Sequence, residues 1–218
     1  LSNRAQALSS TKDGVDQAIS TVQAATNGLD AIGELTRQAE GLARSARNTS
    51  DPDQRAALAG QFNELRNQID GIAQDAGFNG TNLVQASPDD LDVALNEDGS
   101  SSLTIQGTDS SSGGLGINAT TFATDADIDA ALAETQAAQA SVRTNTASLG
   151  ASTSALQTRL DFTEDLTNTL ESGVAKLTEA DLTEEAANRL AVDTRQQIGI
   201  NSLSLASQSQ TAILGLFG

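Results

Sequence analysis

Residues 1–29, LSNRAQALSSTKDGVDQAISTVQAATNGL, decide the fold of this chain. Their large apolar residues recur every seven positions, and these are Leu1, Leu8, Val15, Val22 and Leu29, with Ala5 and Ile19 between them. Apolar residues at this spacing line one stripe of a helix. A stripe sustained over many turns is typical of a coiled-coil seam. The sequence therefore predicts one long helix over about 3–47.

A second apolar seam occupies the last half of the chain. Its members are Val142, Leu149, Leu156, Leu170 and Val174, with Ile128, Leu132 and Leu160 at offsets of three or four. Thr124, followed three residues later by Asp127, has the pattern of a capping box, which marks a helix start. We therefore expect a second long helix over about 124–175.

A shorter helix is predicted between the two seams, over about 52–76. Asp51 is suited to cap it, Pro52 fits the first helical position, and Gln54 completes a capping box. Gly77 is suited to end it. Its apolar stripe consists of Leu58, Phe62, Leu65, Ile69 and Ile72. The short break before Asp51 indicates an antiparallel pair of helices.

The pattern changes to period two in the middle of the chain. Leu91, Val93 and Leu95 alternate with polar residues, as do Leu103 and Ile105 after a Gly-containing turn. This pattern predicts a β-hairpin within a region of about 84–122. The Gly/Ser-rich stretch 107–116 is expected to be an exposed loop. The predicted fold class is mainly α, an elongated antiparallel coiled-coil rod of long helices with a small β-hairpin region.

The end of the chain is unusually apolar. Asp181, followed three residues later by Glu184, indicates a new helix start, so we divide the chain into a rod domain, 1–177, and a C-terminal helix, 178–218. Eight apolar residues of that helix form a candidate interface: Leu190, Ile198, Leu203, Leu205, Ile213, Leu214, Leu216 and Phe217. A large unpaired apolar surface usually marks an interface. Two alternatives remain open, namely that this segment folds back on the bundle or that it stays loose until a partner covers it.

Composition argues against several classes of function. The net charge of the 218 residues is −17, which disfavours binding to nucleic acids and to anionic membrane surfaces. The chain has no His and no Cys, so the usual proton shuttle, thiolate nucleophile and soft metal ligands are absent. Asp125, Asp127 and Asp129 imitate a calcium loop, but Ala130 replaces its required Gly. We expect neither an enzyme nor a bound cofactor or metal.

Several stretches of the sequence resemble bacterial flagellins. Residues 74–83, QDAGFNGTNL, are similar to the Phe-Asn-Gly-x-x-Leu junction of that family. Residues 181–185, DLTEE, followed by 203–210, LSLASQSQ, and 213–217, ILGLF, closely resemble the flagellin C-terminus. The order of the predicted elements also matches, and the resemblance covers nearly the whole chain.

The resemblance implies a structural subunit that assembles into the extracellular flagellar filament for motility. It implies as partners other flagellin subunits, an export chaperone, the flagellar type III export apparatus and hook-associated proteins. The outer domain of larger flagellins is reduced here to a short Gly/Ser loop, so a short form is expected. Leu1 matches the start of the family's rod helix, and the family's N-terminal core arm has no counterpart before it.

The resemblance also locates the patch that innate immune receptors recognise on some flagellins. Counted back from the Phe-Asn-Gly junction, it falls on residues 35–42. Arg37 and Glu40 match the recognised pattern, but the three residues Gln38, Ala39 and Gly41 do not. This mismatch argues against receptor recognition.

Two alternatives remain beside the filament subunit. A hook–filament junction protein shares the terminal plan, although the hairpin and the short loop favour flagellin. A flagellin-like extracellular ligand-binding protein is the other, although sugar-binding platforms generally use aromatic rings and the chain has no Trp or Tyr.

Overall fold

The computed structural model describes residues 2–214. The elements in that range are α1 (Ser2–Arg47), α2 (Pro52–Asp75), β1 (Leu91–Ala94), β2 (Ser102–Ile105) and α3 (Asp125–Leu214). The chain divides into a larger unit, Gln6–Thr167, and a smaller unit formed by the two ends of the chain. The predicted mainly α fold with long helices and a small β-hairpin is confirmed.

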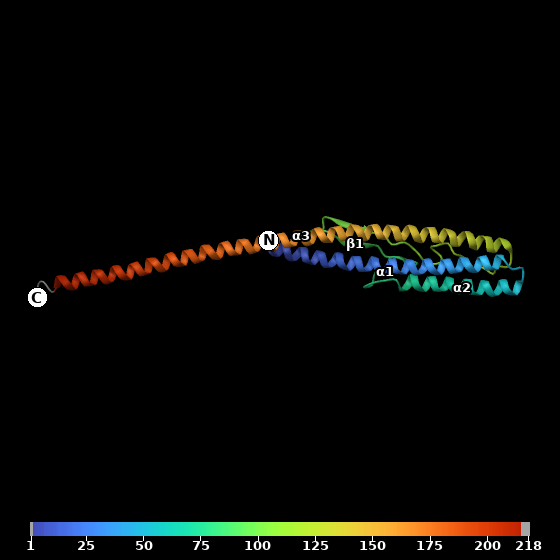
Figure 1. Ribbon diagram of the computed structural model, residues 1–218, viewed down its shortest axis with the longest axis horizontal. Helices are drawn as coiled ribbons and strands as arrows, with labels where there is room; N and C mark the ends of the chain where they lie inside the picture. Colours follow the sequence, from blue (N-terminus) through green and yellow to red (C-terminus); the bar gives the residue numbers. More distant parts are fainter. Residues whose placement is uncertain (1, 215–218) are drawn as a thin grey trace. The chain divides into compact units, whose positions relative to one another are not determined.

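In the larger unit, α1, α2 and the first part of α3 lie side by side (Figure 1). The predicted seams form its core, since Leu8, Val15, Val22, Leu29, Val142, Leu149 and Leu156 are all buried. Phe62 from α2 meets Phe122 edge-to-face, with ring centroids 5.3 Å apart. Many of the other buried residues are Ala, which allows the helices to approach closely. The seven-residue spacing therefore predicted the buried face correctly.

The hairpin covers part of this core. β1 and β2 pair antiparallel, with Leu91 opposite Ile105 and Val93 opposite Leu103. Val93 and Ile105 are buried. The residues that alternate with them along each strand are exposed. This alternation is the one expected of a hairpin with one face against a core.

The caps of the helices agree only in part with the predicted ones. Thr124 and Asp127 exchange the two hydrogen bonds of the expected capping box. Asp51 caps α2 by accepting from the Asp53 N–H, but the side chain of Gln54 accepts from the Thr49 hydroxyl instead of closing a box. Gly77 directly follows the C-cap residue Ala76 but does not adopt the positive φ of a left-handed cap.

The Gly/Ser-rich stretch 107–116 differs from the predicted exposed loop. Ser110, Ser111 and Ser112 are buried. Asp70 of α2 accepts hydrogen bonds from both the backbone N–H and the hydroxyl of Ser112, at 2.7 and 2.9 Å. The side-chain amide of Asn145 in α3 donates to the Ser110 hydroxyl. Small polar residues therefore fill this part of the larger unit because helix side chains satisfy them, which composition alone did not reveal.

The predicted helix end near residues 173–177 and the new start at Asp181 are wrong, because α3 continues to Leu214. Gly173 does not adopt the positive φ of a left-handed cap. A helical Gly costs only about 1 kcal/mol relative to Ala, and no Pro follows it to stop the helix. The division into a rod domain, 1–177, and a C-terminal helix, 178–218, stays a prediction.

Polar bridges join α1 to α3 within the larger unit. Lys12 forms an ion pair with Glu164 at 2.5 Å. The hydrogen bond that Lys12 donates to Glu164, together with the negative charge of that carboxylate, raises the pKa of Lys12. Near the other end of α1, Glu40 accepts a hydrogen bond from Gln139 at 2.7 Å and pairs with Arg44. Contacts near both ends of α1 therefore fix its register against α3, in addition to the apolar seam.

We predict that Gly28→Ala destabilises the larger unit, although Ala favours helix formation. A Cβ at residue 28 would lie 2.4 Å from the Cβ of Ala76, which is much closer than carbon atoms approach. Overpacking of this kind costs about 1–3 kcal/mol, more than the gain of about 1 kcal/mol in helix propensity. The matched control is Gly14→Ala, where a Cβ meets nothing within 4 Å. Thermal unfolding followed by circular dichroism should show a lower Tm for the first variant and an unchanged or higher Tm for the control.

A second prediction concerns Glu40, whose side chain is 13% exposed. The hydrogen bond from Arg44 holds the pKa of Glu40 below its ordinary value of 4.5. Because the folded pKa is lowered, the carboxylate contributes stability above about pH 4.5 that is lost as the pH falls through the folded pKa. Glu40→Gln should therefore cost about 1 kcal/mol at pH 7 and much less at pH 3.

Urea unfolding at both pH values measures this difference. Glu34→Gln is the control, because Glu34 forms an exposed pair with Arg37 on the same helix and should contribute little. An equal loss of stability at pH 7 and pH 3 for Glu40→Gln would contradict the proposed electrostatic role of Glu40.

Candidate interaction surface

The part of α3 in the smaller unit exposes large apolar side chains. Those of Leu177, Leu182, Leu190, Val192, Ile198, Ile200, Leu203 and Leu205 are between 56% and 77% exposed. At about 100° per residue, Leu190, Ile198 and Leu205 fall on one side of the helix, whereas Val192 and Leu203 fall on the opposite side. A helix that is apolar on opposite sides is typical of a buried position with neighbours all round it. A single flat surface could cover only one of these sides.

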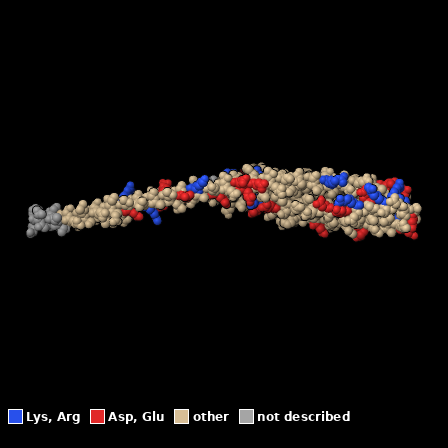
Figure 2. Space-filling view, in the orientation of Figure 1, with Lys and Arg blue, Asp and Glu red and all other residues tan. Residues whose placement is uncertain are grey.

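Charge is absent from the end of this helix. Arg195 is the last charged residue of the sequence, and residues 196–218 contain none. On the face shown in Figure 2, charged side chains are visible on the larger unit and along much of α3, but not on the stretch of α3 next to the grey residues. Burying an unpaired charge is costly, so a segment that is to be surrounded by protein is expected to carry none. Apolar residues on opposite sides and the lack of charge therefore both indicate a segment that other protein covers.

The predicted interface residues fall into three groups. Leu190, Ile198, Leu203 and Leu205 are exposed on α3. Ile213 and Leu214 lie in the last turn of α3, where side chains are not described, and Leu216 and Phe217 lie outside the described residues. Val192 and Ile200 are also exposed on α3 but were not among the predicted interface residues. Placing the residues at helical angles would have identified them.

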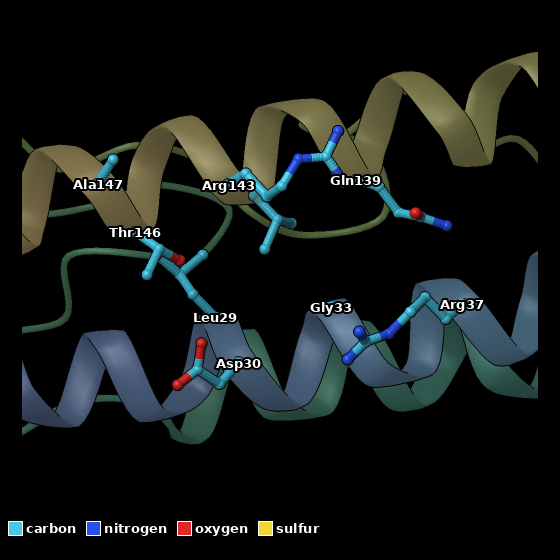
Figure 3. A pocket seen from close by; sticks show the side chains of 9 residues that line it. Leu29, Asp30, Gly33, Arg37, Gln139, Arg143, Thr146 and Ala147 are labelled. Carbon is cyan, nitrogen blue, oxygen red and sulfur yellow. The ribbon is translucent and has the colours of Figure 1, made fainter.

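A groove of about 370 Å³ opens between α1 and α3 in the larger unit. Figure 3 shows Leu29, Asp30, Gly33 and Arg37 on its α1 wall and Gln139, Arg143, Thr146 and Ala147 on its α3 wall. Leu29 and Val142, which form its apolar floor, also belong to the core. The sequence reasoning did not predict this groove.

Arg37 and Glu40, the two candidate receptor residues, lie on α1 with different surroundings. Arg37 is exposed, pairs with Glu34 at 2.6 Å and lines the groove. Glu40 is engaged within the larger unit by Arg44 and Gln139. The two residues therefore do not form one free recognition surface, and the expectation that receptors do not recognise this patch stays a prediction.

The acidic residues at the start of α3 bind arginine side chains. Asp125 accepts from Arg55 at 2.7 Å and pairs with Arg47 at 3.0 Å, and these cations lower the pKa of Asp125. Asp129 lies 3.5 Å from Arg47. Across residues 2–214, no group of three or more His, Cys, Asp or Glu side chains is arranged to hold a metal ion. None of the helices in the described range is long and apolar enough to span a membrane.

Two family models match the chain. The model of the bacterial flagellin N-terminal helical region matches residues 1–88, and that of the C-terminal helical region matches residues 128–217. Together they cover the chain except for its last residue and residues 89–127, which contain the hairpin and the Gly/Ser-rich loop.

Several flagellins are similar over nearly the whole chain. Flagellin FljM of Caulobacter vibrioides is 34% identical over 215 residues, which are 98% of this chain and 78% of that protein. A flagellin of Brucella melitensis is 27% identical over 97% of this chain and 79% of its own length.

A solved structure shares the fold. The crystal structure of Bacillus cereus flagellin matches with a TM-score of 0.62 at 20% identity, over 69% of this chain and 88% of that one. From the family models and the relatives, we conclude that the chain belongs to the bacterial flagellin family, the structural proteins of the flagellar filament.

Proposed function

We propose that the chain beyond Thr167 supplies the main assembly contact of this filament subunit, with Leu190, Ile198, Leu203, Leu205, Ile213, Leu214, Leu216 and Phe217 as its interface. The observation that carries the proposal is the presence of exposed apolar residues on opposite sides of this helix. Other flagellin subunits fit as neighbours because copies of the same segment are equally apolar and equally uncharged. Covering such residues stabilises by about 25 cal/mol per Å² of apolar surface.

Before assembly, the same residues need another partner. Exposed apolar side chains on a helix promote nonspecific association, so a subunit needs a chaperone to cover them until it is exported. We assign this role to a flagellar export chaperone that binds the segment 178–218. We further assign export to the extracellular filament to the flagellar type III apparatus, and contacts at the filament ends to hook-associated proteins. The comparisons favour the filament subunit over a hook–filament junction protein.

Substitutions on opposite sides of α3 test the assembly contact. We expect Leu190→Ser with Ile198→Ser, and separately Val192→Ser with Leu203→Ser, to prevent filament formation. Each pair removes about 3 kcal/mol or more of apolar burial, which corresponds to a hundredfold or greater rise in the protein concentration needed for assembly. Sedimentation and negative-stain electron microscopy of the whole protein measure the outcome.

The matched control is Gln196→Ser with Gln197→Ser, which changes two polar residues of the same helix. Circular dichroism should show that the larger unit melts at the same temperature in all three variants. Assembly that tolerates the loss of either apolar side would contradict a helix surrounded by neighbours and would leave contact on one face only.

A further inference from the structure

We propose that the groove between α1 and α3 receives the turn at Phe78 of a second copy of this chain. The inference rests on the proposed function, because it supplies a lateral contact between subunits of the filament. It involves only the larger unit and is therefore separate from the contact made by the end of α3.

The groove has an apolar floor and little to fill it. Leu29 and Val142 form the floor, and Gly33 leaves room because it has no side chain. A Cβ at Gly33 would lie 3.5 Å from a methyl carbon of Val142, so even a small side chain there would occupy part of the space. A volume of about 370 Å³ is enough for one aromatic side chain with its backbone.

Two arginine side chains line the groove, one on each wall. Figure 3 shows Arg37 on the α1 wall and Arg143 on the α3 wall. Arg37 already pairs with Glu34, whereas Arg143 is exposed and has no ion pair or side-chain hydrogen bond within the part of the chain that the structure describes. Asp30 adds one negative charge to the α1 wall, so the α3 wall is the side that can accept a carboxylate.

The turn after α2 presents an aromatic ring that fits such a groove. Phe78 is 42% exposed, and its backbone pairs with Thr81 through hydrogen bonds of 2.9 and 3.0 Å. Asn79 and Gly80 take φ values of 49° and 84°, the left-handed values that close a tight turn. The ring is thus held out by a defined turn, so little conformational entropy is lost on binding.

A carboxylate without a partner lies close to Phe78 in the sequence. Asp75 is the last residue of α2, is exposed, and has no ion pair or side-chain hydrogen bond among the described residues. A negative charge at a helix C-terminus is unfavourable, because the helix dipole is negative there. A cation supplied by another molecule would offset this unfavourable interaction. The carboxylate of Asp75 therefore complements the charge of Arg143, and the ring of Phe78 complements the apolar floor next to it.

The other exposed aromatic residue of the larger unit is a weaker candidate. Phe162 is 53% exposed, but the guanidinium of Arg159 lies over its ring, 5.1 Å from the centroid. This cation–π contact covers one face of the ring. Phe78 has no such contact in the described range, so docking its ring does not displace a cation.

The positions of the two surfaces suit a contact between copies. Ala76, two residues before Phe78, packs against Gly28 of α1, which adjoins the groove residue Leu29. The turn and the groove therefore lie at the same level of the larger unit but are different surfaces. If the groove of one copy receives the turn of a second copy and its own turn enters a third, the contact continues into a ring or an open filament.

Cysteine cross-linking tests the contact, since the chain has no Cys of its own. One preparation of the whole protein carries Phe78→Cys, and a second, longer by an affinity tag, carries Thr146→Cys in the groove. The two are mixed, assembled and oxidised. We expect mixed dimers at least tenfold more abundant in filaments than in dilute subunits, and the mixing excludes bridges within one molecule.

Phe162→Cys mixed with Thr146→Cys is the matched control and should give few mixed dimers. Filaments in which the Phe78→Cys pair cross-links no better than this control would overturn the proposal and leave the proposed function intact. Failure of the unsubstituted protein to form any filament would overturn the proposed function, and the docking contact with it.

A charge exchange gives an independent readout without cysteine. Asp75→Arg and Arg143→Asp should each raise the concentration needed for assembly about fivefold, the size expected for a partly exposed ion pair. The double variant should restore that concentration to within about twofold of the unsubstituted protein. Losses that simply add in the double variant would show that the two residues do not meet.

Discussion

The structure depends on how the chain distributes its apolar surface between its own core and other molecules. In the larger unit, the seams of α1 and α3 face each other, so one molecule can bury both. Beyond Thr167, α3 is apolar on opposite sides, which no single packed surface can cover. The larger unit therefore buries its own seams, whereas α3 beyond Thr167 leaves its large apolar side chains exposed.

The distribution of charge follows the same division. All of the charged side chains lie at or before Arg195, and they give the chain its net charge of −17. Mutual repulsion between such subunits opposes association. Residues 196–218 contribute no charge to this repulsion. Assembly therefore requires apolar burial large enough to exceed the repulsion between the larger units, or specific cation–carboxylate contacts that reduce it locally.

The sequence predicted well whatever depends on periodicity. The seven-residue spacing from Leu8 to Leu29 identified the buried face of α1, and the alternation around Val93 identified the hairpin. It predicted poorly whatever depends on contacts between distant residues. Asp70, which is far away in the sequence, accepts the hydrogen bonds that satisfy the buried Ser112. No residue near Ser112 in the sequence signals this contact. The helix predicted to end near residue 175 continues to Leu214, since Gly173 does not adopt a left-handed conformation there.

The groove shows why part of the candidate site could not be found from the sequence. Gly33 has no side chain to signal a role, and only the fold places it opposite Val142. Leu29 and Val142 looked like ordinary seam residues, yet they form both the core and the floor of a surface depression. Arg143 differs from the other arginines of the larger unit only in lacking a partner, which a sequence cannot show. A helical seam that is interrupted by Gly and flanked by an unpaired cation is thus suited to bind a second molecule, because the packing that holds the helices together also shapes the depression.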